Sequence, residues 1–453
     1  MGNSAINKET SWKKHEMVLF RFFFVYFILQ AVPVDWKFYE RLHRISWWSV
    51  DFSDIFNISR YTRQILNSPT TPDFWGINTF WDWGIMALIA LVSAAVWSFI
   101  DKRREYALLY YVLRVILRYR LAIGVIAYGF IKLFPMQSPY PSLSELNTNY
   151  GDLSAWKIFS LTLGVAPSFE MFLGLVEITA GLLLLHRKTV FLASFIILCF
   201  TGNVFLSNLA YAGGEVVYSL YLIQFALFLL WYDAPRLFRL LSLEKPAYPN
   251  TFKMPYKRDW QSKARLLLKS AFVLFFVLLY GIKTYGIYKK GGYQFPLEKG
   301  ELKEGFYHVS SFIYNGQNLA FSKNDHARWQ DVVIEKWTTL SIKTGQQADP
   351  ITSNVEVIHS RDEEKDYEFS GTTGRQYYRY QLDKSKEKLL LKTLNGDKNE
   401  SFTLDINQLN DSTILLKGVN EKRDSLQVVL KQNDKKYLLE EAKKGGRRSG
   451  LVL

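Results

Sequence analysis

Residues 168–189, SFEMFLGLVEITAGLLLLHRKT, decide the fold of this chain. The stretch is apolar over the length of helix that crosses about 30 Å of hydrocarbon, and it ends in a basic cluster. Two glutamates and two glycines recur in it at spacings of four, three and four, which is one helical face: Glu170, Gly174, Glu177 and Gly181. The pattern predicts a membrane-spanning helix whose glycines let a neighbouring helix approach closely and whose carboxylates face the bundle interior.

Six more apolar stretches of roughly 17 to 25 residues lie before residue 287. The seven predicted spans cover residues 17–35, 80–100, about 107–135, 163–185, 189–209, 215–232 and 267–286. The first has no small-x-small cleavage motif and is expected to stay as an anchor. The third carries Arg114, Arg118 and Arg120 in its first half, so we expect a cytoplasmic interfacial helix that turns into a span near Leu121.

The distribution of Lys and Arg predicts the orientation of these spans. The loops on the side of the N-terminus hold 16 such residues and the opposite loops hold six, so the N-terminus is expected in the cytoplasm of a bacterium. Seven crossings of the inner membrane then place the C-terminal region in the periplasm. The net charge of +14 has the same origin, because no nucleic-acid-binding motif accompanies it, and no nucleic acid is expected as a partner.

Two regions outside the spans also have predicted structure. Residues 36–80 are aromatic and moderately charged, which suits either a helix in the outer membrane interface or a segment packed against the bundle. From Gly291 onward, apolar and polar residues alternate in short runs separated by turn residues, with Asn395-Gly396 as the best hairpin signal. The runs predict an antiparallel meander that forms a small barrel or half-barrel: 332–342, 376–382, 388–394, 401–406, 413–417, 425–431 and 435–439.

Ionisable and amide side chains within the spans are the candidates for chemistry, because such groups are costly in lipid. Counted from the prolines that end their helices, Lys132 and Glu170 should lie at similar depth and form an ion pair. Tyr128 and Glu177 should lie roughly 10 and 15 Å inside. Asn203 lies near that layer, with Asn208 closer to the outer surface. The group forms either a pocket open to the periplasm that holds a quinone, lipid headgroup or small substrate, or an interhelical network that orients the bundle.

Several classes of site are excluded by the sequence. The single cysteine, Cys199, rules out an intramolecular disulfide, a CxxC pair and a cysteine zinc site. The six histidines have no ligand spacing, so no metal site is predicted. No phosphate-binding loop, dinucleotide fingerprint, nucleophile elbow or zinc-protease motif occurs.

Residues 107–241 resemble the DoxX-like family of four-helix membrane proteins, in the larger form with added anchor helices and a β-rich tail. The resemblance rests on four segments in order: RLAIGVIAYGFIKLFPMQSPYP from Arg120, SFEMFLGLVEITAGLLLLHRKT from Ser168, GNVFLSNLAY from Gly202 and LLWYDAPRLFRLL from Leu229. It implies an inner-membrane bundle, in some members associated with quinone-linked oxidoreductases and in others with maturation of exported proteins. The motif positions in this chain are Tyr128, Lys132, Gln137, Glu177, Asn203 and Asn208.

The predicted fold is therefore a membrane all-α bundle of about seven spans with a C-terminal antiparallel β domain. The predicted domains are anchor helices with an interfacial segment (1–106), the DoxX-like bundle (107–241), a cytoplasmic loop and last span (242–286), a periplasmic β domain (287–442) and a flexible tail (443–453). The leading hypothesis is a subunit of a quinone-associated or envelope complex whose partners are membrane lipids and other envelope proteins. An enzyme would use Glu177 as proton acceptor and Lys132 as electrostatic stabiliser. The alternative is a scaffold without catalytic activity.

Overall fold

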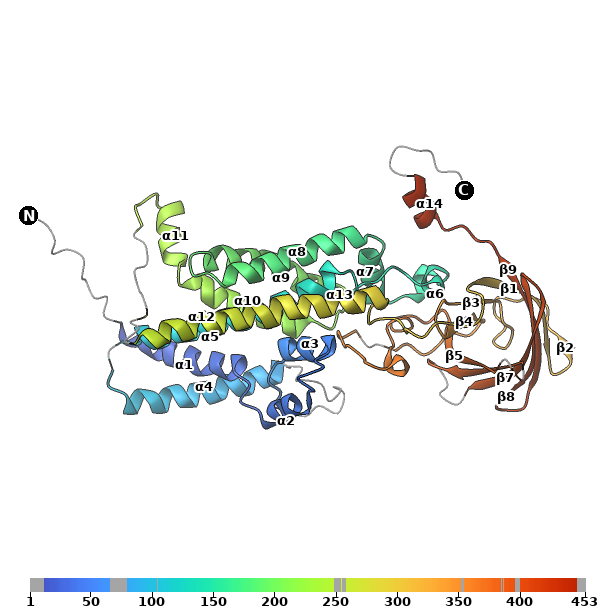
Figure 1. The fold of residues 1–453 in the computed structure, drawn as a ribbon, viewed down its shortest axis with the longest axis horizontal. Coiled ribbons are helices and arrows are strands. Elements are labelled where there is room, and N and C mark those ends of the chain that lie inside the picture. Colours follow the sequence, from blue (N-terminus) through green and yellow to red (C-terminus); the bar gives the residue numbers. More distant parts are fainter. Residues whose placement is uncertain are drawn as a thin grey trace, which may run out of the picture. The chain divides into compact units, whose positions relative to one another are not determined.

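The computed structural model describes residues 12–65, 80–103, 105–247, 254, 258–351, 354–383, 385, 387–395 and 400–445 (Figure 1). The chain forms two compact units: residues 1–134, 172–209 and 215–286 in the first, and residues 135–171, 210–214 and 287–453 in the second. The β-rich C-terminal region thus shares its unit with the loop 135–171, which the sequence analysis included in the four-helix domain.

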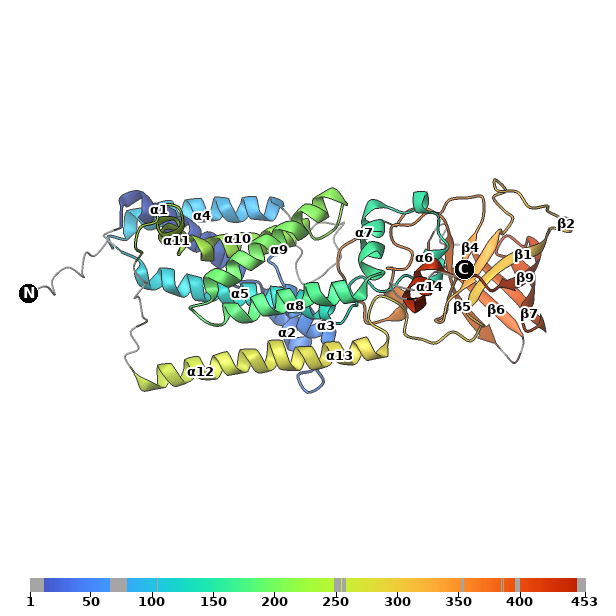
Figure 2. The same ribbon diagram turned by 90° about the horizontal axis from the view of Figure 1, so that it is seen from above.

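In its described residues the first unit is helical. Its helices are α1 (Lys14–Ala31), α2 (Trp36–Arg44), α3 (Phe52–Arg60), α4 (Phe80–Ile100), α5 (Ala107–Leu133), most of α8 (Pro167–Leu184), α9 (Val190–Ala210), α10 (Val216–Trp231), α11 (Ala234–Leu241), α12 (Asp259–Val273) and α13 (Tyr280–Lys290). A π-helical stretch, Leu274–Leu279, joins α12 to α13, so that the two form one long helix at the edge of the bundle (Figure 2).

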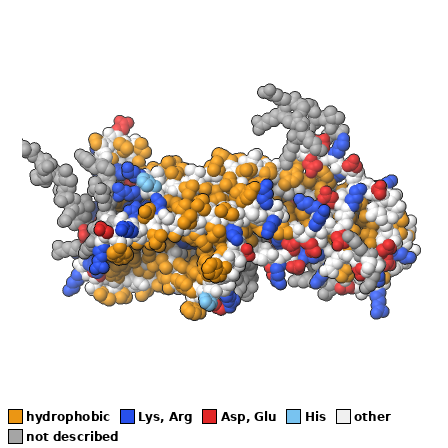
Figure 3. Space-filling view, in the orientation of Figure 1, with side chains coloured by type: hydrophobic (Ala, Val, Ile, Leu, Met, Phe, Trp, Pro, Cys, Tyr) orange, Lys and Arg blue, Asp and Glu red, His pale blue; other side chains and the backbone are white. Residues whose placement is uncertain are grey.

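Several of these helices have the length and composition of membrane spans. Five qualify directly: Lys14–Arg44, Phe80–Ile100, Pro167–Leu184, Val190–Ala210 and Asp259–Lys290. The pair α10 and α11, bent by 64°, gives a sixth if it counts as one span. Hydrophobic side chains cover these helices in Figure 3, and Lys and Arg gather near α11. The composition is that of a multi-pass membrane protein.

Helix α5 differs from its prediction. It is a single helix of 27 residues, and the turn expected near Leu121 is absent. The reason is burial: Leu113, Leu117 and Arg120 all face protein, and nearly every residue from Leu121 to Lys132 is buried. Helix α5 is therefore a central helix of the bundle. Its arginines keep it from qualifying as a span by composition.

The predicted close approach at the α8 glycines is confirmed. A Cβ atom added at Gly174 would lie 2.3 Å from the Leu133 nitrogen and 2.5 Å from the Gly129 carbonyl oxygen of α5. One added at Gly181 would lie 2.5 Å from Cγ1 of Ile126. Backbone-to-backbone contact of this kind needs a residue without a side chain, so these glycines set the packing of α5 against α8.

Gly174→Ala is accordingly expected to lower the free energy of unfolding by about 1 to 3 kcal/mol, because the added methyl group forces the two backbones apart. The matched control is Gly84→Ala in α4, where an added Cβ would meet no atom within 4 Å. That variant should be neutral or gain up to about 1 kcal/mol of helix propensity. Thermal unfolding in mild detergent, followed by circular dichroism, compares the two, and equal Tm values would contradict the packing described above.

The segment after α1 contains two short helices, α2 and α3. In α3, Phe52 and Phe56 are buried, with the Phe56 ring 5.5 Å from that of Tyr128 and the Phe52 ring stacked 5.8 Å from that of Tyr280. Trp47 and Trp48, by contrast, are exposed. Helix α3 is therefore packed against the bundle, whereas the exposed Trp47 and Trp48 suit the membrane interface. Residues 66–79 of this segment lie outside the described residues.

The second unit is built on an antiparallel barrel. Its strands are β1 (Gly305–Tyr314), β2 (Gln317–Asn318), β3 (Asp331–Ile334), β4 (Thr339–Lys343), β5 (Gln376–Asp383), β6 (Lys388–Thr393), β7 (Ser401–Asn410), β8 (Thr413–Asn420) and β9 (Ser425–Asn433). Neighbours pair in the order β2-β1-β3-β4-β5-β6-β7-β8-β9, and β1 also pairs with β9. Eight strands therefore close, with β2 as a short addition to β1, and the predicted small barrel is confirmed.

Helices and turns complete this unit. They are α6 (Leu143–Leu146), the 3-10 turn Tyr150–Asp152, α7 (Ala155–Gly164), the first turn of α8, the 3-10 turn Asp362–Glu364 and α14 (Leu438–Gly445). The run 332–342 contains two strands, β3 and β4, rather than one. The predicted strand 435–439 is wrong, because helix α14 begins at Leu438 and continues through helix-forming Glu, Ala and Lys residues. Residues 446–453 of the predicted tail lie outside the described residues.

Strand β1 was not predicted, for a local reason. A β-bulge between Val309 and Ser311 shifts its pairing with β9, so Tyr307, Val309 and Phe312 all point into the barrel. The extra residue breaks the two-residue alternation on which strand prediction depends. Side chains fill the barrel interior, since the cavity among Leu302, Trp329 and the other apolar residues there measures about 10 Å³. That is room for one water molecule at most, so this cavity has no space for an organic ligand.

Candidate functional site

A buried ion pair lies between α5 and α8. Lys132 Nζ donates to Glu177 Oε1 at 2.6 Å, and both side chains are buried. The ammonium group is also 5.5 Å from the Phe200 ring centroid and 6.0 Å from that of Tyr128. Within the described residues the second carboxylate oxygen, Glu177 Oε2, is buried with no hydrogen-bond partner. The pair therefore leaves one acceptor unused in the interior of the bundle.

The partner of Lys132 differs from the prediction, which was Glu170. The glycine contacts fix the antiparallel register: Leu133 faces Gly174, Gly129 faces Ile178, and Ile126 faces Gly181. Lys132 is therefore level with Leu175, about 7.5 Å along α8 from Glu170. Counting depth from Pro135 and Pro167 was wrong because α5 and α8 are offset from each other along their axes.

A second ion pair joins the first through Tyr128. Arg60, at the end of α3, lies 2.5 Å from Glu215 Oε1, just before α10. Tyr128 donates its hydroxyl to Glu215 Oε2 at 2.9 Å, and the Glu215 backbone N–H donates to Asn208 Oδ1 at 3.0 Å. The predicted residues Tyr128, Lys132, Glu177 and Asn208 thus lie in one charged cluster. Sequence analysis missed Arg60, which it placed in a loop, and Glu215, which it placed at the first position of the predicted span 215–232.

Arg120 has a structural role in the same unit. Its guanidinium donates to the Ser59 carbonyl oxygen at 2.6 Å, to the Tyr61 carbonyl oxygen, and to the Tyr221 hydroxyl at 3.0 Å. Tyr221 in turn donates to the Gln30 carbonyl oxygen at 3.2 Å. Arg120 therefore satisfies carbonyl groups at the end of α3 and ties α3 to α5 and α10.

The remaining predicted site residues lie elsewhere. Gln137 donates to Glu356 Oε2 at 3.1 Å, and Glu170 accepts from the Ser138 backbone N–H at 3.1 Å, both within the second unit. Asn203 is exposed on the surface of α9. The predicted constellation is thus divided, with four of its members in the charged cluster of the first unit.

The second unit has a charged core that the sequence analysis did not select. Lys157 and Glu145 are buried and 2.5 Å apart, and Lys157 Nζ also donates to the Tyr367 carbonyl oxygen at 2.5 Å. Ser144 donates its backbone N–H and its hydroxyl to Glu335 Oε1, each at 2.7 Å. In the sequence Ser144, Glu145 and Lys157 lie in a loop between predicted spans, and Glu335 lies in the predicted strand run 332–342. Only the folded chain brings residues 144–157 beside residues 335–367.

Glu368 completes this buried acidic group. It accepts hydrogen bonds from Trp337 Nε1 at 3.0 Å and from the Thr339 hydroxyl at 2.9 Å. Burial, reinforced by the charge of Glu335, raises the pKa of the Glu368 carboxyl well above its usual value of 4.5, and burial also raises the pKa of Glu335. The folded protein therefore holds protons on this group that an unfolded chain would release.

The pH dependence of stability follows from these shifts. A carboxyl whose pKa is raised by folding contributes its full stabilisation below pH 4.5, and this is lost as the pH rises toward the folded pKa. We expect the Tm of the second unit to fall as the pH rises above 4.5. Glu368→Gln keeps both hydrogen bonds without ionising, so the fall should be shallower. The control Glu363→Gln, at an exposed carboxylate, should keep the wild-type slope, and identical slopes for all three proteins would contradict the assignment.

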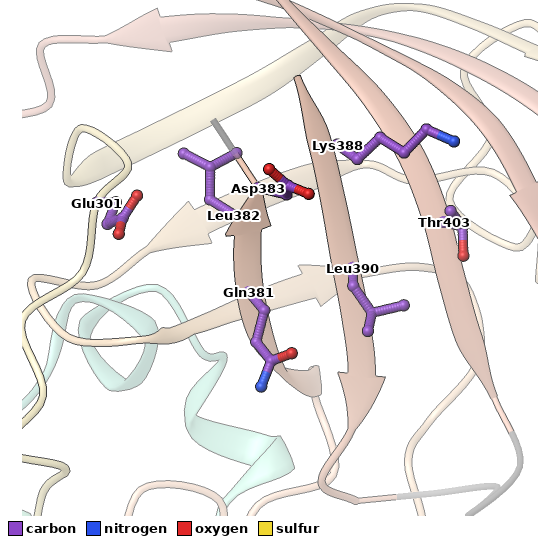
Figure 4. Close-up of a pocket in the computed structure, with 7 residues that line it drawn as sticks. All are labelled: Glu301, Gln381, Leu382, Asp383, Lys388, Leu390 and Thr403. Atoms are coloured by element: carbon purple, nitrogen blue, oxygen red, sulfur yellow. The ribbon is translucent and has the colours of Figure 1, made fainter. Parts of the chain in front are cut away.

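The remaining candidates among the described residues are a metal site and a groove that could bind a ligand. No group of three or more His, Cys, Asp or Glu side chains among them is placed to hold a metal ion. A shallow groove on the outside of the barrel, lined by Glu301, Gln381, Leu382, Asp383, Lys388, Leu390 and Thr403, opens to solvent (Figure 4). Its side chains do not converge on one point. Comparison of the chain with protein-family models, with curated proteins and with solved structures finds no match.

Proposed function

We propose that this chain is a DoxX-like subunit of a bacterial inner-membrane complex and that its bundle binds a quinone or a lipid headgroup beside Lys132 and Glu177. The observation that carries the proposal is the buried, unpartnered Glu177 Oε2 next to a lysine. A buried ion pair is favourable only when the remaining lone pairs are also satisfied. A hydroxyl of a quinol or of a lipid headgroup would donate the missing hydrogen bond to Glu177 Oε2. Lys132 would continue to neutralise the Glu177 carboxylate.

The scaffold hypothesis is the alternative, and one observation favours it. Arg60, Glu215, Tyr128 and Asn208 satisfy one another as an interhelical network would. In that case the membrane helices anchor the barrel domain, and the barrel would bind an envelope partner.

Native mass spectrometry of protein extracted in mild detergent separates the two. We expect the wild type to retain a quinone or phospholipid, and the double variant Lys132→Met/Glu177→Leu to lose it while remaining folded, because replacing both charges leaves none unpaired. The matched control is Lys157→Met/Glu145→Leu, which removes a buried pair of the second unit and should retain the ligand. Wild-type protein without bound quinone or lipid would support the scaffold instead.

We further propose that the N-terminus lies in the cytoplasm and the barrel in the periplasm. The excess of Lys and Arg in the loops on one side of the predicted spans supports this orientation. The barrel would then lie where a partner from the cell envelope can reach it.

A further inference from the structure

Asn203 has an unusual position on α9. The helix spans Val190–Ala210, so the side chain lies about 10 Å along the axis from its nearer end. It is exposed, and its amide forms no hydrogen bond within the described residues. Asn208 on the same helix differs, because its amide donates to the Val204 carbonyl oxygen at 2.9 Å and accepts from Glu215.

An unpaired amide is costly at this depth. In hydrocarbon no water is present to bond it, and an isolated polar group there costs several kcal/mol. The asparagine side chain is too short to reach an interface about 10 Å away. A partner from another membrane helix is the usual solution, because amide side chains hydrogen-bond across helix interfaces.

The surface around Asn203 allows a helix to pack there. Phe195, Cys199 and Leu206 are exposed at helical spacing on the same face as Asn203. A Cβ added at the adjacent Gly202 would meet no atom within 4 Å, so a second helix has room to approach. The whole of α9 lacks Asp, Glu, Lys, Arg and His, and two identical faces can therefore meet without charge repulsion.

We propose that this face of α9 pairs with α9 of a second copy of this chain. A carboxamide is both donor and acceptor, so two copies of Asn203 satisfy each other across a two-fold axis. An axis along the membrane normal keeps both copies in the same orientation and places identical residues opposite each other. The proposal is independent of the function proposed for Lys132 and Glu177.

Cys199, one turn from Asn203, makes the pairing directly measurable. Membranes that contain the full chain are treated with a short bis-maleimide, and we expect cross-linked dimers through Cys199. Asn203→Leu should weaken dimerisation by roughly 5- to 30-fold, the effect of one interhelical hydrogen bond of about 1–2 kcal/mol in a membrane. Asn203→Gln, which keeps the amide, should retain dimers better than Asn203→Leu. The leucine substitution is on an exposed position and should leave the fold intact.

The control moves the thiol to another exposed helix. In a Cys199→Ala background, Val92→Cys places a cysteine near the middle of α4 at an exposed position, and it should give no dimer. Absence of a Cys199 cross-link in the wild type, with a monomer mass in native mass spectrometry, would overturn the proposal. So would cross-linking that Asn203→Leu leaves unchanged, or equal cross-linking from Val92→Cys, since either result indicates random collision.

Discussion

Lys132→Met is expected to lower the free energy of unfolding of the helical bundle by about 3 to 5 kcal/mol, because it leaves the Glu177 carboxylate buried without its counter-charge. Glu177→Gln should cost a similar amount, since it leaves the Lys132 ammonium group unpaired 2.6 Å away. For a buried carboxylate without a counter-charge, neutralisation would leave stability unchanged or raise it, but with Lys132 beside Glu177 we expect stability to fall. Thermal unfolding in detergent measures both variants.

The double variant Lys132→Met/Glu177→Leu distinguishes pairing from independent effects. Removal of both charges leaves neither one isolated, so the double variant should recover most of the loss. Lys132→Met/Glu170→Gln provides the comparison, because Glu170 accepts from Ser138 and lies further along α8. There we expect losses that add. Additive losses in the first double variant would show that Lys132 and Glu177 do not interact.

Lys157→Met should have the largest effect on the second unit. Lys157 is fully buried, and its ammonium group lies 2.5 Å from Glu145 and 3.9 Å from the Tyr367 ring centroid. Its loss leaves Glu145 buried near Glu335 and Glu368, so we expect destabilisation of about 3 to 5 kcal/mol. The exposed Lys388 provides the control, and Lys388→Met should change stability by less than about 0.5 kcal/mol.

Limited proteolysis distinguishes a local effect of Lys157→Met from unfolding of the whole chain. The charged core joins residues 144–157 to residues 335–368, so cleavage should begin in the second unit while the helical bundle stays protected. A Lys157→Met protein as resistant as the wild type would show that this ion pair contributes nothing to the unit.

Local periodicity accounts for the parts of the fold that sequence alone predicts. The spacing of Gly174 and Gly181 predicts a face that a neighbouring helix approaches, and both glycines contact α5. The alternating runs from Gln376 to Lys431 predict strands, and β5 to β9 form a meander there. In each case a periodic pattern acts within one element, where helix or strand geometry determines which residues share a face.

The candidate site was less predictable because it depends on register between elements. Lys132 was predicted to pair with Glu170 because both were expected at the same depth in the membrane. The axial offset between α5 and α8 instead places Lys132 beside Glu177. Arg60 and Glu215 are 155 positions apart in sequence and meet only when α3 and α10 pack on α5. Asn203 is a polar residue that was predicted to line the pocket, but it lies on the exposed face of α9. The sequence could not show this, because a helix that is apolar all round does not indicate which side packs against the bundle.

Cysteine accessibility in whole cells tests the central claim, a multi-pass membrane protein with its barrel outside the cytoplasm. The label sites are two exposed positions, Lys417 in β8 and Arg187 between α8 and α9, each changed to Cys in a Cys199→Ala background. With a thiol reagent that crosses the outer membrane but not the inner one, Lys417→Cys should be labelled in intact cells, and Arg187→Cys only after the inner membrane is broken. Labelling of Lys417→Cys only in broken cells would contradict the account.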